Sequence, residues 1–313
     1  MFDNLLSDVK KRAPWRRVSL RLVWFLVIVL VAAGTGIARA DVPDASSAAS
    51  LRARYAASQD RLSNNQFHRP IYLDSTQSSS DLKGDIHAVV EYPFATVNAA
   101  LKGATQWCDI LILHLNVKYC RASPGASGTS LAVYIGRKFD QPLEAAHRVD
   151  FSYRVATETS DYLQVLLAAD IGPFGTKNYR IMVEAVPLEG RTFLHLSYSY
   201  AYGTTARLAM QAYLNTFGSD KVGFTVIGNR SDGQPIYVGD VRGAVERNTI
   251  RYYLAIDAYL AAFSAPPQEQ LEKRLRDWFA SSERYRLQLH ELEENEYLEM
   301  KRKEYRRQQQ EIR

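Results

Sequence analysis

The sequence predicts an α+β protein in which an antiparallel curved sheet wraps a long helix, followed by a C-terminal helical extension. Three observations support this fold class. Between residues 131 and 202, five segments alternate apolar and polar side chains and are separated by short turns, the pattern of an antiparallel meander. A long helical pattern, Val241–Phe263, follows these strands. Pro266 and Pro267 then end that helix and begin another.

The first 40 residues resemble a secretory signal peptide. A basic stretch runs to Arg21, an apolar run covers residues 22–37, and Ala38-Arg39-Ala40 has the small residues that a signal peptidase reads. An uncleaved membrane anchor is the alternative, because the apolar run approaches the spanning length of about 17–25 residues. Both interpretations place the main domain outside the cytoplasm, either periplasmic or exported, or anchored in the inner membrane.

The charge of the chain is concentrated in this leader. The formal net charge is +5, and residues 1–40 alone hold seven basic and two acidic side chains, so the remainder is balanced. Phosphate binding needs clustered positive charge. We therefore expect no nucleic-acid partner, and we expect membrane contact only through residues 22–37 if the leader is not cleaved.

Residues 41–66 are predicted to form a linker with a short helix, Leu51–Leu62. The main domain is predicted to cover residues 67–264. Its first half is expected to contain the strands Ile71–Leu73 and Lys83–Tyr92, the turn Thr76–Asp81, and the helices Phe94–Leu101 and Thr105–Ile110. Pro93 should end the second strand, since proline lacks a backbone donor.

The segment from Trp107 to Cys120 contains the only two cysteines. It begins as a helix end and continues as a strand, in which alternate residues from Leu111 to Tyr119 face one side. Export would place Cys108 and Cys120 in an oxidising compartment. A helix that turns back beside the following strand could bring them together, so we predict a disulfide, with two buried thiols as the alternative.

The second half of the domain is predicted to be mainly strands. They are Leu131–Arg137, His147–Ala156, Tyr162–Ala169, Asn178–Val186 and Thr192–Tyr202. A helix, Thr204–Phe217, a β-like segment, Val222–Ile227, and a turn, Asn229–Gly233, precede the long helix.

Residues 265–313 are predicted to form one amphipathic helix with a coiled-coil-like stripe. The stripe repeats by three and four and consists of Leu271, Leu275, Trp278, Ser282, Tyr285, Leu289 and Leu292. Residues 267–292 should dock on the domain itself, on a second copy of the chain or on another protein. Beyond Leu292 the pattern fades into charged residues, so we expect little burial there.

The order of these elements resembles the START-like superfamily (helix-grip, SRPBCC). The strand Lys83–Tyr92, two short helices, the run of strands and the helix Val241–Phe263 carry the likeness, over about half of the chain. The resemblance implies a cavity between sheet and helix for a lipid or other apolar ligand. The inserted segment 204–241 leaves open which of two helices the sheet grips.

One face of the predicted strands is apolar and rich in tyrosine. If it lines a cavity, the candidate ligand-binding residues are Phe151, Tyr153, Ile181, Leu196, Tyr198, Tyr200 and Tyr202. Tyrosine offers an apolar ring with a polar tip, which can orient a ligand. The alternative is that these residues fill a closed core.

The opposite faces are polar. They carry His87, His114, Asn116, Lys118, Arg148, Asp150, Arg154, Glu184 and His195, which indicates either a solvated outer surface or a buried acid–base site. Asp85, His87 and Glu91 share one strand face, but steps of about 7 Å are too long for one metal ion. No catalytic residue, metal site or cofactor is predicted.

These observations favour an exported binding protein for an apolar or amphipathic ligand such as a lipid. One alternative is an interaction protein that uses its C-terminal helix. Another is an enzyme, since polyketide cyclases belong to the superfamily that the chain resembles.

Overall fold

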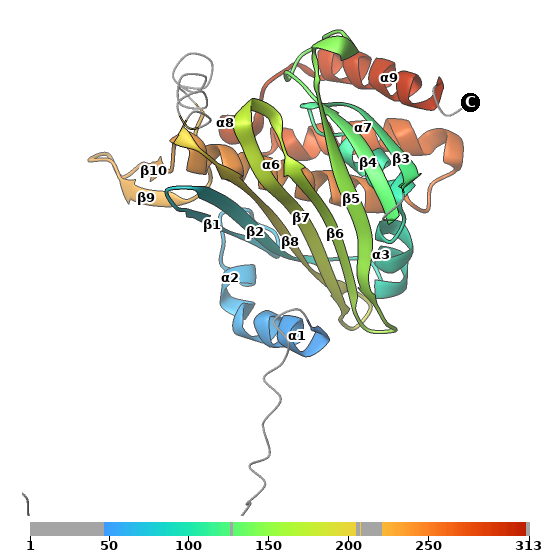
Figure 1. Ribbon diagram of the computed structural model, residues 1–313. Helices are drawn as coiled ribbons and strands as arrows, with labels where there is room; N and C mark the ends of the chain where they lie inside the picture. The colour runs from blue at the N-terminus through green and yellow to red at the C-terminus, as the bar shows by residue number, and fades with distance from the viewer. Residues whose placement is uncertain (1–46, 126–127, 205–206, 208–220, 311–313) are drawn as a thin grey trace, which may run out of the picture. The chain divides into compact units, whose positions relative to one another are not determined.

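The computed structural model describes residues 47–125, 128–204, 207 and 221–310 (Figure 1). Contacts between residues separate residues 1–42 from one compact unit, Pro43–Arg313. The predicted leader lies outside the described residues, and so does most of the predicted helix Thr204–Phe217. Within the described part of the chain, no helix is both long enough and apolar enough to cross a membrane.

One large antiparallel sheet dominates the compact unit. Its eight strands lie in the order β1-β2-β8-β7-β6-β5-β4-β3. Their bounds are β1 Ile71–Gln77, β2 Asp81–Val90, β3 Val117–Gly125, β4 Gly128–Ile135, β5 His147–Glu158, β6 Leu163–Ile171, β7 Thr176–Pro187 and β8 Thr192–Tyr202. The predicted meander is confirmed, and the strand before the two short helices pairs with the last strand of the meander.

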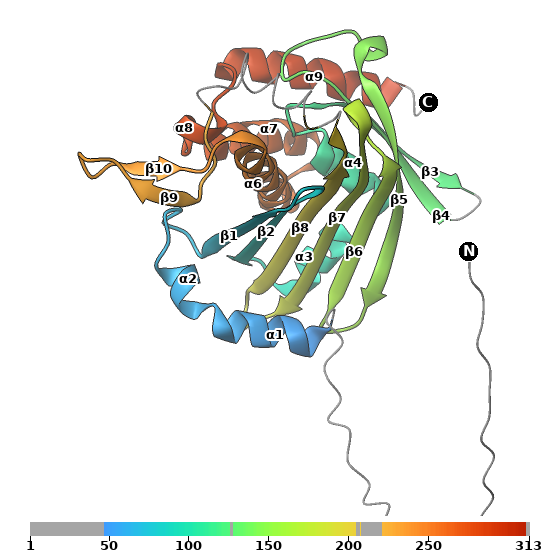
Figure 2. The same cartoon turned by 60° about the vertical axis from the view of Figure 1, so that its left-hand side comes forward.

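Helices surround the sheet, and a small hairpin projects beside it (Figure 2). The helices are α1 Ala48–Ala57, α2 Gln59–Ser63, α3 Phe94–Leu101, α4 Ala104–Leu111, α6 Asp240–Ala262, α7 Pro267–Glu283, α8 Arg286–Leu289 and α9 Glu294–Gln310. Single 3-10 turns cover Leu143–Ala145 and Pro173–Gly175, and the hairpin consists of β9 Val226–Asn229 and β10 Pro235–Tyr237. The predicted helix Leu51–Leu62 is therefore two short helices, because the helical conformation is interrupted at Ser58.

The long helix α6 lies on the concave face of the sheet, so it is the gripping helix (Figure 2). It packs tightly against Gly84 of β2, where an added Cβ would overlap the side chain of Thr249 in α6. Glu246, one turn earlier in α6, is fully buried and accepts hydrogen bonds from the backbone N–H groups of Phe224 and Thr225 at 2.6 and 2.9 Å. Sequence and structure thus agree on a sheet that wraps a long helix.

Helices α1 and α2 cover the convex face where β1, β2, β8 and β7 lie side by side. Leu51 of α1 and Leu62 of α2 pack there against Tyr72, Val186 and Phe193, in a small core separate from the main one. The prediction of a solvated outer face is therefore wrong for His87, Glu184 and His195, and it is also wrong for His114 and Lys118 elsewhere in the chain, because all five are buried. It holds for Arg148, Asp150 and Arg154 of β5, which are exposed.

The C-terminal region contradicts the prediction of one continuous helix. Non-helical residues near Tyr285 and at 290–293 divide it into three helices, α7, α8 and α9. No continuous coiled-coil seam therefore forms among the described residues. Leu275, Trp278 and Leu289 belong to the main core. The expectation of little burial beyond Leu292 is also wrong, because Tyr297, Leu298, Met300, Lys301 and Glu304 of α9 are buried.

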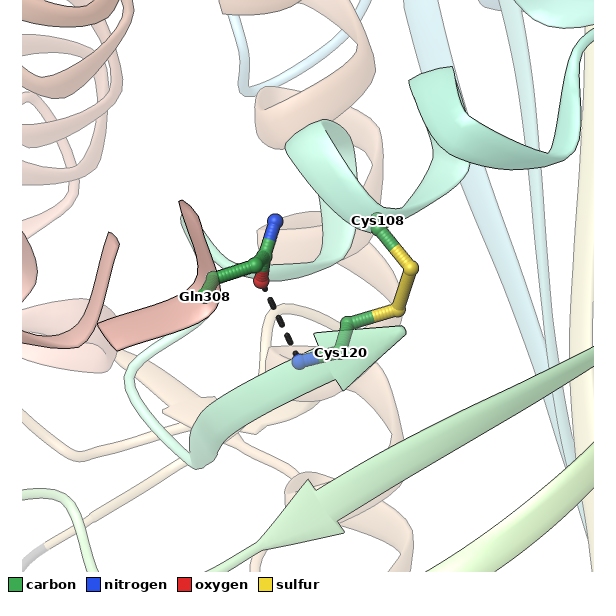
Figure 3. Close-up of a disulfide and its surroundings, with 3 residues drawn as sticks. All are labelled: Cys108, Cys120 and Gln308. Atoms are coloured by element: carbon green, nitrogen blue, oxygen red, sulfur yellow. Dashed lines mark hydrogen bonds between the residues drawn. A yellow bond between two sulfur atoms is a disulfide. The ribbon is translucent and has the colours of Figure 1, made fainter. Parts of the chain in front are cut away.

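The predicted disulfide is confirmed, and α9 lies beside it (Figure 3). Cys108 of α4 and Cys120 of β3 have their Cα atoms 5.1 Å apart. Gln308 of α9 accepts a hydrogen bond from the backbone N–H of Cys120 at 3.1 Å. Because β3 is an edge strand, this contact covers backbone that would otherwise be open to pairing with another chain.

Candidate ligand site on the concave face of the sheet

The candidate residues lie on three strands, and the strand register brings them together. Tyr153 of β5 is opposite Leu167, which is opposite Ile181, which in turn is opposite Tyr198 of β8. Tyr198 is opposite Gly84, where α6 reaches the sheet. The neighbouring row, which contains Leu196, is aliphatic. The concave face thus changes from aliphatic to aromatic along its strands.

The aromatic end of this face is a cluster of stacked rings. Tyr179 lies parallel to Tyr200 with ring centroids 5.0 Å apart, and Phe151 meets the edge of Tyr179 at 6.5 Å. Tyr198 lies 5.7 Å from Tyr200. Of the seven predicted residues, all except Tyr153 are buried, and Tyr153 packs against the same core. Entry of a ligand between these side chains stays a prediction.

The hydroxyl groups of the cluster differ in what they bind. Tyr202 donates to the carbonyl of Ser78 at 2.8 Å, and Tyr179 bonds to the hydroxyl of Thr176 at 2.9 Å. The buried hydroxyl of Tyr153 has no hydrogen-bond partner among the described residues. An unpartnered buried polar group costs about 1–3 kcal/mol. A closed aromatic core would avoid that cost, whereas a site that receives a polar ligand atom would use the group.

Two residues that the sequence did not assign to the site extend it across α6. Tyr252 of α6 lies 5.1 Å from Tyr198, and His114 lies 4.7 Å from Tyr252, both measured between ring centroids. Nδ1 of His114 accepts from the backbone N–H of Asn116 at 3.1 Å, and its Nε2 has no partner within the described structure. The sequence pattern predicts His114 on a polar strand face, whereas in the structure it lies in the loop before β3. The sequence contains no pattern that assigns Tyr252 to the site, because its contact with Tyr198 of β8 forms only when α6 packs on the sheet.

The ionisable groups of the site are held neutral. Burial raises the pKa of Tyr153 to about 12 and the pKa of Tyr198 well above its usual value. Burial, and then the positive charge of Arg251, Lys301, Lys138 and Lys118, lowers the pKa of His114 well below its usual value. Near neutral pH these phenols and this imidazole are therefore hydrogen-bond donors without charge.

A hollow among the described residues lies away from these seven candidates. It is an open cleft of about 330 Å³ between the end of β2, α6 and α7, and its lining includes Arg69, Tyr92, Asp257, Asp277 and Arg284. Arg69 and Asp257 form a salt bridge of 2.8 Å across it. None of the seven candidate residues lines this cleft.

A second polar group of residues lies on the convex face beneath α1. Tyr72, His87, His195, Glu184 and Gln164 are cross-strand partners in one row over five strands. His195 has Nδ1 2.8 Å from a carboxylate oxygen of Glu184 and Nε2 2.9 Å from one of Asp85. Because both ring nitrogens are bound to carboxylates, neither is available as a general base.

Metal binding gains no support from these groups. Among the described residues, no three His, Cys, Asp or Glu side chains are placed to hold one ion. Asp85 binds His195, and Glu91 forms an ion pair of 3.6 Å with Arg191.

Comparison with known proteins gives a likeness of fold and nothing more specific. No family model matches the chain, and no curated protein matches it either. Solved structures do match at the level of topology. Norcoclaurine synthase from Thalictrum flavum is 14% identical over 44% of this chain and 86% of its own, with a TM-score of 0.31.

Two further structures have similar values. Ara h 8.0201 is 11% identical over 61% of this chain and 99% of its own, with a TM-score of 0.34. The Zhui aromatase/cyclase from Streptomyces sp. R1128 is 10% identical over 69% of this chain and 97% of its own, with a TM-score of 0.27. The predicted fold class, an antiparallel sheet that wraps a long helix, is confirmed by the strand order and by α6 on the concave face. Likenesses of this size say nothing about ligand or activity.

Proposed function

We propose that the protein is an exported binding protein for an apolar or amphipathic ligand such as a lipid, held between the concave face of the sheet and α6. One observation carries this proposal. Two buried polar atoms, Nε2 of His114 and the hydroxyl of Tyr153, have no hydrogen-bond partner among the described residues, although the lining around them is apolar and aromatic. Apolar walls with a few convergent polar groups are typical of small-molecule sites. Export rests on the leader, residues 1–40.

The ligand site is tested by enlarging it. Tyr200→Ala in a closed core should lower the free energy of unfolding by about 3–5 kcal/mol. In a site that opens for a ligand, the loss should be much smaller, and binding of an environment-sensitive apolar dye should change instead. Phe193→Ala is the matched control, since Phe193 is fully buried in the separate convex core. Dye fluorescence and urea unfolding are measured on the wild type and on both variants.

A ligand site and a closed core predict different results. We expect a full penalty for Phe193→Ala, a small one for Tyr200→Ala, and dye binding that only the Tyr200 variant alters. Equal penalties in both variants, with no dye bound by the wild type, would remove the proposal. Lipid extraction and mass spectrometry of the purified protein then identify what it carries.

Export is tested separately. Cell fractionation should recover the protein from the periplasm or the membrane. N-terminal sequencing of the mature chain should begin at Asp41 if the leader is cleaved after Ala40. Recovery in the cytoplasm with an intact Met1 would contradict export.

A further inference from the structure

The loop before β3 lies among buried cations that share few carboxylates. Lys118 and Lys301 are fully buried and both pair with Glu304, at 3.0 and 2.8 Å. Arg251 is 1% exposed and pairs with Glu291 at 2.8 Å, and Lys138 binds the same oxygen of Glu291. Four cationic side chains therefore pair directly with two carboxylates in this group, which we call the cation cluster, and the charge of a third carboxylate, Asp140, also acts on Lys118.

Excess positive charge is costly in such a place. Desolvation of an ion costs several kcal/mol unless an opposite charge offsets it. Burial is accordingly the main cause that lowers the pKa of Lys301 and of Lys138, each to about 8, although a glutamate opposes it in both cases. The cluster can accept one more anion without excess negative charge.

His114 connects the cation cluster to the candidate ligand site. Lys301 donates to the carbonyl of His114 at 2.7 Å, while the His114 ring packs on Tyr252 on its other side. Nδ1 of His114 accepts a hydrogen bond, so the proton of the neutral ring is on Nε2. That N–H is a buried donor for which the described structure offers no acceptor.

The hydroxyls of Tyr252 and Tyr198 continue this line of donors. Their ring centroids lie 5.1 Å apart, and neither hydroxyl has a hydrogen-bond partner among the described residues, 47–125, 128–204, 207 and 221–310. Beyond Tyr198, the lining becomes aliphatic at Leu196 and Val183, which are opposite each other. Donors and positive charge thus lie at one end of the site and aliphatic side chains at the other.

We infer that the ligand is an amphipathic acid whose anionic group binds at His114, Tyr252 and Tyr198, with its apolar part along the concave face. This inference rests on the proposed function and specifies its ligand class. A hydrogen bond between neutral donors and a charged acceptor is stronger than one between neutral groups, and nearby cations favour the anion further.

Three probes with the same alkyl chain test the head group. Dodecanoate, dodecanol and dodecylamine compete with the bound apolar dye in the wild-type protein. We expect dodecanoate to compete at least tenfold better than dodecylamine, with dodecanol between them. Dodecyl phosphate, run beside dodecanoate, separates a preference for carboxylates from a preference for phosphates. Equal competition by dodecanoate and dodecylamine overturns the inference and leaves the proposed function standing.

Single-atom changes locate the head group. Tyr252→Phe and Tyr198→Phe each remove one hydroxyl and keep the ring, and each should weaken dodecanoate about tenfold, as expected for one lost hydrogen bond to a charged group. Dye binding should not change. Tyr179→Phe is the control, because the hydroxyl of Tyr179 already bonds to Thr176. An equal effect in the control, or no effect in either variant, contradicts the inferred position.

His114→Phe adds a test of the buried donor and should also lower dodecanoate binding. If that variant fails to fold, the two tyrosine variants decide. If the dye binds and none of the amphiphiles displaces it, the inference is wrong. If the wild type binds neither the dye nor any amphiphile, the proposed function fails with it.

Discussion

His87 and His195 stack in parallel on the convex face of the sheet, with ring centroids 4.4 Å apart and ring planes 4° from parallel. Burial lowers the pKa of His195, but hydrogen bonds to Asp85 and Glu184 outweigh burial, so the pKa lies above its ordinary value. Burial, and then the positive charge of His195, lowers the pKa of His87 to about 2. Just below pH 6.5 a neutral His87 ring therefore lies against a protonated His195 ring, and the two histidines give the stability of the protein opposite pH dependences.

His195 should make the protein less stable as the solution becomes alkaline. Because its pKa is raised on folding, the folded state keeps the proton above pH 6.5, where the unfolded chain loses it. The contribution is complete below pH 6.5 and is lost as pH rises through the raised pKa. His195→Gln should flatten this alkaline slope in urea unfolding and lower stability at pH 6.5 by about 3–5 kcal/mol. The exposed His68→Gln is the control, and an unchanged slope in His195→Gln would contradict the argument.

His87 should make the protein less stable as the solution becomes acidic. Its folded pKa of about 2 lies below the ordinary 6.5, so the unfolded chain takes up a proton between these values and the folded protein does not. Stability falls as pH falls below 6.5, and protonation of Asp85 adds to the loss as pH falls from 3.8 through its lowered pKa of about 2. His87→Phe keeps a stacking ring and should reduce the loss between pH 6.5 and 4. The same loss in wild type and variant would show that other groups cause it.

Local sequence signals were enough for most elements of the main domain. Pro93 is the N-cap of α3, and the predicted helix Phe94–Leu101 matches the structure at both ends, whereas β2 ends at Val90, before the predicted end at Tyr92. Uninterrupted alternation likewise fixed β8 as Thr192–Tyr202. The disulfide followed from a helix that turns back before a strand. Each of these features depends on residues close together in sequence.

Features that depend on tertiary contacts were missed. The heptad pattern continues through Tyr285 and Leu289, so periodicity gave no sign of the breaks that separate α7, α8 and α9. The burial of His87 and His195 depends on α1, whose few apolar residues did not indicate docking. At the candidate site, strand alternation found Tyr198 and Tyr200, but Tyr252 joins them only because α6 crosses the sheet there.

The C-terminal helix α9 should be essential for stability. Glu304 is the shared carboxylate of Lys118 and Lys301, and all three side chains are buried. Glu304→Gln leaves two buried ammonium groups without a counter-charge, so we expect a loss of about 3–5 kcal/mol in urea unfolding. Asp150→Asn breaks the exposed ion pair with Arg148 and should cost less than about 1 kcal/mol. Equal small losses would mean that α9 is dispensable, as the sequence suggested.

The disulfide should contribute measurably as well. Cys108 and Cys120 close a short loop with a sequence separation of 12, for which chain entropy predicts about 3 kcal/mol. Replacement of both cysteines by alanine should lower the free energy of unfolding by that amount, and reductant should lower only the wild type. A thiol reagent should label neither cysteine in denatured protein that has not been reduced. Complete labelling under those conditions would exclude the bond.

Gly84 should be the least replaceable residue of β2. A Cβ at this position would overlap the side chain of Thr249 in α6. Gly84→Ala should therefore lower stability by about 1–3 kcal/mol, as overpacking does in other cores. Thr249→Ala in the same chain removes the overlapping hydroxyl and should recover part of the loss. Gly203→Ala is the control, because an added Cβ there meets no atom of the described residues within 4 Å. If Gly84→Ala unfolds at the wild-type urea concentration, α6 does not grip the sheet at this point.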